Sequence, residues 1–574
     1  MKIIIISIIL TVSTNLIFSQ TFEDKLIQEY EELITKKMES DKIVGVSAAL
    51  IVNDSLVWEK GFGFADIENQ IPMTKNTVVN IGSITKPVTA LCAMQLQDKG
   101  LLDINQPVTK YLPQFHPKTR FGDINQIKVK DLIVHSSGIQ SDIWKNSDLN
   151  SGKYTDVVDF INETQLLYPP GVLGFYSNSG YNILGHVLKE VSGVDYKNYV
   201  HENIFKALGM KNSGFWVDSL KNKTKIYDNG RNEVKEYPLR DIASGGIYCD
   251  VHDFALLAKG IINSYNDNIP AILKSKTMQE VFTVQNNDAG YVIGRNKRGL
   301  GWYLFTNDTT IAANHTGSAG YAYAHIMVLP QNKAALVIFT NSSNGWNLCN
   351  QAGYKLLEHF NLVVQDVFLK PLISEKNESN VAFEVDENTL LNHVGYYSEA
   401  LSYSQIFFEN DTLRISQNDK IFNLIPVNEN EFLPYDYQGK LIEDTRYYFK
   451  DIEPFQVLIQ KNGNNEHVIG YKFYGVDTTK WNNKQGYYEH FGYQMIAGDT
   501  KFKGIELKIS ENKVLIAVLE TLENNKFAVP LDVISEKYAT TAGLMSGYGM
   551  TVSFTENEKY YIIDFGGLTF RKEK

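Results

Sequence analysis

The sequence predicts an α+β fold for the first two thirds of the chain and an all-β fold for the rest. Two hairpin patterns, at residues 44–63 and 324–343, enclose a region with helical periodicity, and short aromatic strands begin after residue 380. Strands from both ends of a region that surround helices form one antiparallel sheet backed by helices. We therefore predict an antiparallel sheet flanked by helices with an all-helical insertion, followed by all-β modules of small-barrel or lipocalin-like type.

Each predicted element has a local signal. The first hairpin has two apolar runs around Asn53 and Asp54, and the second has two around a turn at residues 330–333. Between them, apolar side chains recur at helical spacing in three segments, residues 85–99, 180–192 and 251–263. These elements predict a single domain over residues 21–365.

The C-terminal part is predicted to contain two β-rich modules. A polar linker at residues 366–380 is followed by short strands rich in Tyr and Phe and broken by Asn, Asp and Gly. A Gly-Tyr-Tyr sequence at residues 395–397 recurs at 486–488, each time before a hairpin pattern. The predicted modules therefore cover residues 381–475 and 476–574.

Composition and charge restrict the classes of partner. The chain has 574 residues, of which 43% are hydrophobic and 21% charged, as is usual for a protein with buried cores. Its formal net charge of -11 repels phosphate backbones and anionic lipid surfaces. We therefore predict no nucleic-acid partner and expect small or uncharged substrates.

The first twenty residues predict export. One Lys is followed by an apolar run up to Phe18 and then by Ser19 and Gln20, a pattern typical of a signal peptide at residues 1–20. The predicted destination is the periplasm or the extracellular space. No later stretch is long enough to span a bilayer, so no transmembrane segment is expected in the mature chain.

The cysteines predict neither a disulfide framework nor a metal site. Only Cys92, Cys249 and Cys349 occur, and they are odd in number, far apart and without paired spacing. No metal or organic cofactor is predicted, and Cys92 is expected to be a core residue.

Residues 81–90 (IGSITKPVTA) place Ser83 and Lys86 three residues apart at the start of an apolar helix. Pro87 fits only in the first turn, so the helix begins near Ser83, and this spacing brings an amine beside a hydroxyl. Such a pair is a nucleophile with a base next to it. Ser83 also suits a helix cap, and S-x-x-K occurs by chance about once or twice in a chain of this length.

Two further polar clusters follow. Tyr176 and Asn178 share one face of an extended stretch that leads into a helix ending at Gly193, although a core aromatic and a helix cap also explain them. His315 and Gly317 share one face of a predicted strand, where a glycine leaves room for a ligand along the strand. A lone histidine is more often structural.

In this order, S-x-x-K at Ser83, Y-x-N at Tyr176 and H-T-G at His315 resemble the serine β-lactamase and penicillin-binding-protein superfamily. The likeness is greatest to its class C-like branch, with DD-peptidases, D-amino-acid peptidases and esterases. Supporting stretches are GFGFADIENQIPMT before the serine, DLIVHSSGI at 131–139, ASGGIYCDVHDFALLAKGI at 243–261 and GLGWYLF at 299–305. The resemblance covers residues 21–365.

The resemblance implies a role for each motif residue. Ser83 would be the acylated nucleophile, and Lys86 and Tyr176 would share the role of general base. Asn178 would orient them and the substrate. The main-chain N–H groups of Ser83 and Ser318 would form the oxyanion hole. For either residue to act as a base at neutral pH, its pKa must lie roughly three below the ordinary value, a change that costs about 4 kcal/mol.

The third motif departs from that of β-lactamases, which have Lys where this chain has His315. The family's Lys is a fixed cation that helps bind the substrate carboxylate, whereas a histidine with an ordinary pKa near 6.5 is mostly neutral at pH 7. His315 and Gly317 are expected to line the substrate site. The departure favours esters or D-amino peptides over β-lactams or D-Ala-D-Ala.

The predicted function is that of an exported serine hydrolase that forms an acyl-enzyme on an ester, a D-amino peptide or a related amide. Its substrate is a small molecule or a peptide, with cell-wall material as one source. One alternative is a β-lactamase or DD-carboxypeptidase. Another is a non-catalytic, penicillin-binding-like receptor with a ligand-binding β tail. A third is a carbohydrate or cell-wall binding module in the tail, in which the Tyr and Phe side chains form a ligand platform instead of filling small barrels.

Overall fold

The computed structural model of the chain describes most of the two predicted regions. The described residues are 23–145, 152–215, 220–269, 271–285, 297–307, 310–362, 383–399, 402–417, 420–452, 455–463, 465–473, 477–491, 501–510, 513–542 and 549–574. The predicted signal peptide at residues 1–20 and the predicted linker at residues 366–380 lie outside the described residues.

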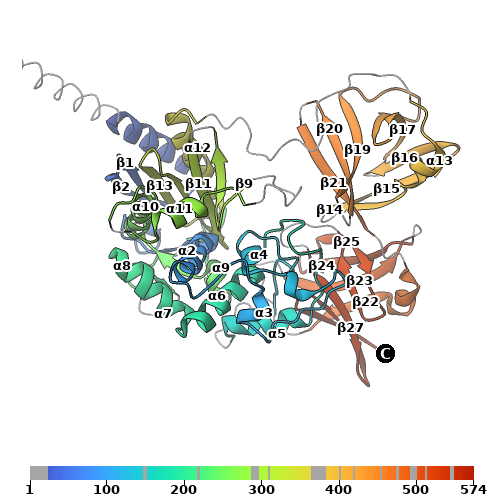
Figure 1. The fold of residues 1–574 in the computed structure, drawn as a ribbon, viewed down its shortest axis with the longest axis horizontal. Helices are drawn as coiled ribbons and strands as arrows, with labels where there is room; N and C mark the ends of the chain where they lie inside the picture. Colours follow the sequence, from blue (N-terminus) through green and yellow to red (C-terminus); the bar gives the residue numbers. More distant parts are fainter. Residues whose placement is uncertain are drawn as a thin grey trace, which may run out of the picture.

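An eight-stranded antiparallel sheet forms the centre of the N-terminal part (Figure 1). Its strand order is β3-β2-β1-β13-β12-β11-β10-β9. The strands are β1 (Gly45–Val52), β2 (Ser55–Asp66), β3 (Ile71–Pro72), β9 (Lys297–Arg298), β10 (Tyr303–Thr306), β11 (Ile311–Ala319), β12 (Ala322–Leu329) and β13 (Ala334–Thr340). β1 pairs with β13, with Val46 opposite Thr340, so the two predicted hairpins join at the middle of the sheet.

Helices cover both faces of this sheet. Along β1, Ala49 and Ile51 belong to one core with α2 and α10, whereas Ala48 and Leu50 belong to a second core with α12 and the helix over residues 23–40. Successive side chains of a strand point to opposite faces, so the apolar run of β1 reflects burial on both sides. The α+β arrangement predicted from the sequence is confirmed.

The helices of the insertion lie beside the α2 face of the sheet (Figure 1). The helices of the chain are α2 (Thr85–Asp98), α3 (Val108–Tyr111), α4 (Val129–Ile133), α5 (Val157–Asn162), α6 (Asn178–Ser192), α7 (Tyr196–Val200), α8 (Lys206–Leu208), α9 (Ile242–Gly245), α10 (Val251–Tyr265), α11 (Ser275–Val281), α12 (Trp346–His359) and α13 (Glu387–Leu391). The segments predicted as helices therefore form α2, α6 and α10. Gly193, in the left-handed conformation, ends α6 as expected for a C-terminal glycine.

Small sheets connect the helices. A three-stranded sheet has the order β4-β8-β5, and a two-stranded sheet pairs β6 with β7. Their strands are β4 (Val79–Asn80), β5 (Gly214–Phe215), β6 (Ile226–Tyr227), β7 (Glu233–Val234) and β8 (Ile247–Cys249). β4 leads directly into the turn that carries Ser83.

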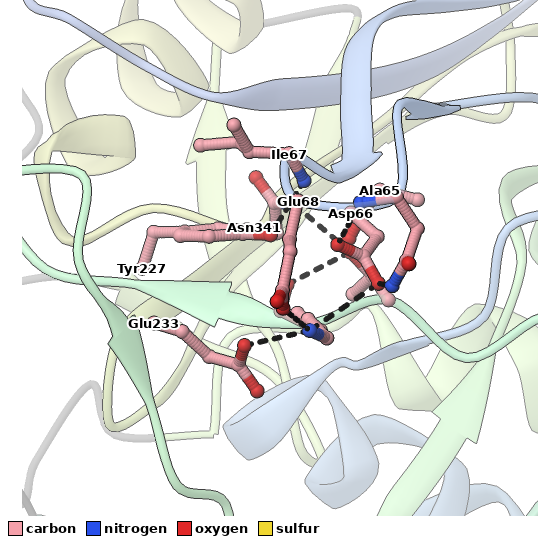
Figure 2. Close-up of polar contacts among 10 residues, drawn as sticks. Ala65, Asp66, Ile67, Glu68, Tyr227, Glu233 and Asn341 are labelled. Atoms are coloured by element: carbon pink, nitrogen blue, oxygen red, sulfur yellow. Dashed lines mark hydrogen bonds and ion pairs between the residues drawn. The ribbon is translucent and has the colours of Figure 1, made fainter.

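An ion cluster holds the β6–β7 hairpin against the end of β2 (Figure 2). The Lys225 ammonium pairs with three carboxylates, those of Glu233 (2.7 Å), Asp66 (3.3 Å) and Glu68 (3.3 Å). The Tyr227 N–H donates to the Asn341 carbonyl (2.9 Å), just after β13. Exposed ion pairs contribute little free energy, so this cluster mainly fixes orientation.

The C-terminal part forms two closed antiparallel barrels of eight strands each (Figure 1). The first barrel has β14 (Gly395–Glu399), β15 (Ser402–Glu409), β16 (Thr412–Gln417), β17 (Lys420–Asn428), β18 (Glu431–Tyr435), β19 (Thr445–Ile452), β20 (Phe455–Asn462) and β21 (Asn465–Phe473). The second barrel has β22 (Gly486–His490), β23 (Phe502–Ile509), β24 (Leu515–Thr521), β25 (Lys526–Val533), β26 (Tyr538–Thr541), β27 (Thr551–Glu556), β28 (Tyr560–Phe565) and β29 (Leu568–Glu573). The predicted all-β modules are small barrels, and the predicted division at residues 475 and 476 lies between β21 and β22.

The repeated Gly-Tyr-Tyr sequence has the same structural use in both barrels. The Tyr397 hydroxyl donates to the His393 carbonyl (2.8 Å), and the Tyr488 hydroxyl donates to the Lys484 carbonyl (2.7 Å). Both tyrosines are fully buried in a barrel core. The buried aromatics of the tail, including Phe432, thus fill the barrels.

Two observations complete the description of the fold. Among the described residues, no helix is both long and apolar enough to cross a membrane. Cys92, Cys249 and Cys349 are buried free thiols, and Cys92 lies in the main core as predicted.

Candidate active site

Ser83 lies in a tight turn of three residues, Gly82–Ile84, directly before α2. Gly82 has φ +52°, a conformation that favours glycine, and its N–H donates to Asn80 Oδ1 (2.8 Å). A Cβ on Gly82 would lie 2.4 Å from the Ser318 carbonyl oxygen. The glycine therefore lets β11 approach the turn, which brings the backbones of Ser83 and Ser318 together.

Lys86 is fully buried and its amine faces Ser83. Its Nζ lies 3.1 Å from Ser83 Oγ and 2.7 Å from the Ser244 carbonyl oxygen of α9. Burial lowers the pKa of Lys86 to about 7, although the carboxylates of Asp142 and Asp241 partly oppose this shift. Lys86 can therefore lose its proton near neutral pH and accept one from Ser83.

Tyr176 approaches the same two residues from the other side. It is half-buried, its hydroxyl is hydrogen-bonded to the Ser83 side chain, and Lys86 Nζ lies 4.7 Å from its ring centroid. Loss of hydration raises the pKa of Tyr176 well above its usual value. Tyr176 is therefore a neutral phenol at pH 7, which can pass on a proton, while Lys86 is the better general base.

Asn178 begins α6 but does not cap it. The cap is Ser177, whose Oγ accepts the Gly180 N–H (2.9 Å). The Asn178 amide donates instead to Asp142 Oδ1 (2.7 Å). Asp142 influences the pKa of Lys86, so the amide of Asn178 holds a carboxylate within electrostatic reach of the buried amine.

His315 is buried on β11 and is neutral. Its Nδ1 donates to the Thr316 carbonyl oxygen (2.7 Å), and its ring centroid lies 6.4 Å from that of Tyr176 and 5.3 Å from that of Tyr303. Burial, with the Lys86 charge, lowers the pKa of His315 to about 3. The ordinary pKa near 6.5 therefore does not apply to His315, and desolvation keeps the ring neutral at pH 7.

Gly317 allows a close approach between β11 and the turn that carries Ser83. A Cβ there would lie 1.9 Å from the Ile81 carbonyl oxygen, so a side chain would push β11 away from the turn that carries Ser83. Gly317 and Gly82 thus allow the same close approach from opposite sides. The neighbouring Ser318 is exposed, as a main-chain donor in an oxyanion hole requires.

The structure brings together the predicted site residues Ser83, Lys86, Tyr176, Asn178, His315, Gly317 and Ser318. The titratable groups that influence or contact Lys86 are Asp142, Asp241, His135, His315, Tyr176 and Tyr181. Burial lowers the pKa of His135 well below its usual value, so neither histidine titrates near pH 7. In the described parts of the chain, no group of three or more His, Cys, Asp or Glu side chains is arranged to hold a metal ion.

Sequence reasoning missed the role of His135. Its Nδ1 accepts the Ser177 N–H (3.0 Å), and its ring centroid lies 4.5 Å from that of Tyr176. It has φ +63°, which is unusual for a residue other than glycine. The stretch DLIVHSSGI contained this residue, but only the three-dimensional contact with Tyr176 reveals that it supports the tyrosine.

The comparisons with known proteins agree with this geometry. The beta-lactamase family model matches residues 30–358. Protein flp of Staphylococcus aureus is 26% identical over 343 residues, which are 58% of this chain and 66% of that protein, and Beta-lactamase-like protein 2 of Dictyostelium discoideum is 28% identical over 287 residues, 47% of this chain and 51% of that protein. The chain thus spans just under two thirds of the length of protein flp.

Solved structures share the fold. The octameric penicillin-binding protein homologue from Pyrococcus abyssi has a TM-score of 0.52 at 23% identity and covers 77% of this chain and 99% of its own. A SurE structure has a TM-score of 0.58 at 18% identity and covers 78% of this chain and 100% of its own. A beta-lactamase/D-alanine carboxypeptidase from Pseudomonas syringae has a TM-score of 0.51 at 18% identity, with coverages of 58% and 99%.

The fold and the Ser83–Lys86–Tyr176 geometry define a protein of the serine β-lactamase and penicillin-binding-protein superfamily. Within it, the matched residues, which are more than half of the chain, show that the protein belongs to the beta-lactamase family.

The pKa of Lys86 predicts the pH dependence of acylation. The rate constant for labelling of Ser83 by a fluorophosphonate should rise with pH through about 7 and then level off, because neutral Lys86 accepts the proton. Stopped-flow labelling between pH 5 and 10 measures this profile. Tyr176→Phe should keep the same limb at a rate about a hundredfold lower. A limb only above pH 9 would instead identify Tyr176 as the base.

The close approach at Gly317 predicts a second outcome. Gly317→Ala should lower the labelling rate about a hundredfold, since relief of the Cβ contact needs β11 to move by about 1 Å, which misplaces the Ser318 N–H. Gly245→Ala is the matched control, because a Cβ there meets its nearest atoms at 3.8 Å or more. Equal rates in the two variants would contradict the role of the close approach.

Proposed function

We propose that the protein is a serine hydrolase that forms an acyl-enzyme at Ser83 with an ester, a D-amino peptide or a related amide. The observation that carries this proposal is the buried Lys86 amine, with a pKa of about 7, at 3.1 Å from Ser83 Oγ. Burial of an amine without an ion-pair partner lowers the free energy of unfolding, and groups of this kind with a shifted pKa are concentrated at functional sites. The Lys86 amine also lies where a general base for Ser83 is needed.

The proposed reaction has two halves. In the first, Ser83 Oγ attacks the substrate carbonyl carbon while its proton moves to neutral Lys86, and the N–H groups of Ser83 and Ser318 stabilise the oxyanion. Collapse breaks the bond to the leaving group, which receives a proton through Lys86 or Tyr176. In the second half, water attacks the carbonyl carbon of the acyl-enzyme and gives up a proton to neutral Lys86. The bond between Ser83 Oγ and the acyl carbon then breaks, Lys86 returns the proton to Ser83 Oγ, and the acid product leaves.

The surroundings of His315 support a substrate that needs no fixed cation at this point. His315 is neutral, and its Nδ1 carries the proton because it donates to the Thr316 carbonyl oxygen. The other ring nitrogen, Nε2, can therefore accept a hydrogen bond. This favours a neutral ester or the N–H of an amide over a substrate carboxylate. SurE, which shares this fold, has a solved structure with D-Leu, and this fold neighbour supports the D-amino class.

A second candidate function is that of a β-lactamase or DD-carboxypeptidase. The family match and the fold shared with the Pseudomonas syringae beta-lactamase/D-alanine carboxypeptidase favour it. A non-catalytic receptor is the third possibility that the experiments below distinguish.

We further propose export to the periplasm or the extracellular space, which the apolar pattern of residues 1–20 supports and which would place the protein near cell-wall peptides.

Substrate choice can be tested with a panel. Wild-type protein should hydrolyse p-nitrophenyl esters or D-amino-acid p-nitroanilides with a kcat/KM at least about tenfold above that for nitrocefin, and Ser83→Ala should lower every rate at least about a thousandfold. Spectrophotometric assays and thermal unfolding of both proteins measure this. Preference for nitrocefin would favour the β-lactamase function. Covalent labelling by fluorescent penicillin without turnover of any substrate would favour a receptor.

Neutrality of His315 gives a further test. Between pH 5 and 8, the ratio of kcat/KM for an anionic ester to that for a neutral ester should not change through a titration near 6.5. The His315→Gln variant should give a profile of the same shape, because glutamine keeps a neutral polar side chain. A limb near pH 6.5 that is present in wild type and absent in His315→Gln would show that the histidine is charged after all.

A further inference from the structure

One loop connects the candidate active site to the second barrel. This loop, residues 138–144 and named the bridging loop here, follows His135 and carries Asp142, which accepts the Asn178 amide (2.7 Å). The Ser141 carbonyl oxygen also accepts the Ser179 N–H at the start of α6 (2.9 Å). The position of the bridging loop thus fixes the first turn of α6.

Gln140 lies at the centre of the bridging loop and is fully buried. Its Nε2 donates to the Asp142 carbonyl oxygen (2.7 Å), and its Oε1 accepts the Thr551 N–H of β27 (3.1 Å). Its own carbonyl oxygen accepts the hydroxyl of Ser177, the cap of α6 (3.1 Å). A buried amide is tolerated only when both of its ends are bonded, so Gln140 requires the barrel on one side and the site on the other.

The second barrel meets the hydrolase domain at two more points of the same region. The Thr551 hydroxyl accepts the Gln165 N–H (2.9 Å), and the Gly566 carbonyl oxygen accepts the Trp144 N–H (2.9 Å). The Trp144 side chain packs against the core of the barrel. Both ends of the bridging loop are therefore bonded to the barrel: Gln140 near its start and Trp144 at its end.

Contacts away from the bridging loop hold the barrel in place. Arg120 pairs with the buried Asp532 carboxylate of β25 (2.8 Å), and the Lys118 ammonium donates to the Tyr538 hydroxyl (3.0 Å). Figure 1 shows the second barrel beside α3, α4 and α5, the short helices of the insertion. The barrel is thus attached to the domain independently of Gln140.

From this geometry we propose that the second barrel is a supporting part of the active site, in which Gln140 and Thr551 act as positioning residues for Asp142 and Asn178. The proposal rests on the proposed function for its kinetic test and explains the use of this part of the β tail. Neither Gln140 nor Thr551 contacts Ser83 or Lys86 in the hydrogen bonds described; they act through Asp142 and Asn178.

A defined electrostatic effect follows from this arrangement. The Asp142 carboxylate raises the pKa of Lys86 against the stronger effect of burial. If the bridging loop moves, Asp142 moves away from Lys86, and the pKa of the amine falls. A change at Gln140 should therefore shift the acidic limb of acylation to lower pH, which a purely structural residue would not do.

The experiment compares three full-length variants with wild type. Gln140→Leu removes both amide bonds at similar side-chain size, and Gln140→Asn keeps the amide but is too short to bond both partners. Arg120→Gln is the matched control, because it breaks the Arg120–Asp532 pair at the same interface without touching the bridging loop. Acylation by a fluorophosphonate is followed between pH 5 and 10, and backbone hydrogen exchange is followed in residues 138–144 and 178–182.

We expect Gln140→Leu to acylate at least tenfold more slowly than wild type, with its acidic limb at lower pH, and to exchange amides of the bridging loop at least tenfold faster. Gln140→Asn should change in the same direction, and it decides the question if Gln140→Leu does not fold. Arg120→Gln should keep the rate within twofold and the same limb, even if it unfolds at a lower temperature.

Two results would overturn the proposal. One is a folded Gln140 variant whose acylation rate, pH profile and amide exchange all equal those of wild type. The other is an equal change of acylation rate and pH profile in the Gln140 and Arg120 variants. If wild-type protein does not acylate at all, the proposed hydrolase function fails, and hydrogen exchange alone decides whether the barrel holds the bridging loop. Unchanged amide exchange in residues 138–144 of the Gln140 variants would then show that the barrel does not hold the bridging loop, and faster exchange would show that it does.

Discussion

The candidate active site depends on one costly interaction, the burial of the Lys86 amine, which has no carboxylate in direct contact among the residues that the structure describes. The amine rests between Ser83 Oγ and the Ser244 carbonyl oxygen, and the nearest influential carboxylates, Asp142 and Asp241, act only through space. A direct ion pair would keep the amine protonated, whereas complete isolation would lower its pKa further. The surrounding loops thus set the distance of two negative charges, and through it the fraction of base that is available at neutral pH.

The other elements of the domain hold the groups around Lys86 in fixed positions. α2 is buried along most of its length and carries Lys86, and the turn directly before it carries Ser83. β11 approaches this turn through the glycines at positions 82 and 317. Tyr176 is held by the ring of His135, and Asn178 by Asp142. Rigid positioning of this kind is what catalysis by preorganised groups needs, since the donors are in place before charge develops.

The sequence predicted what depends on local spacing, and less of what depends on contacts across the chain. Ser83 and Lys86 face each other because they are three residues apart at the start of a helix, and β1 was recognisable from its continuous apolar run. The β modules were predicted as small-barrel or lipocalin-like, but the strand pairs that close them were not, because β14 pairs with β21 and β22 with β29 over long stretches of chain. The role of His135 and the low pKa of His315 were missed, since both depend on burial among residues from other elements.

The second barrel closes only when β29 pairs with β22, with Arg571 opposite Glu489. β29 is synthesised several hundred residues after Ser83 and the bridging loop. During synthesis the nucleophile, its base and the loop all exist, but the partner of Gln140 does not. If the second barrel supports the site as proposed, the bridging loop and the residues around Ser83 become fully ordered only after β29 has been translated and has paired with β22.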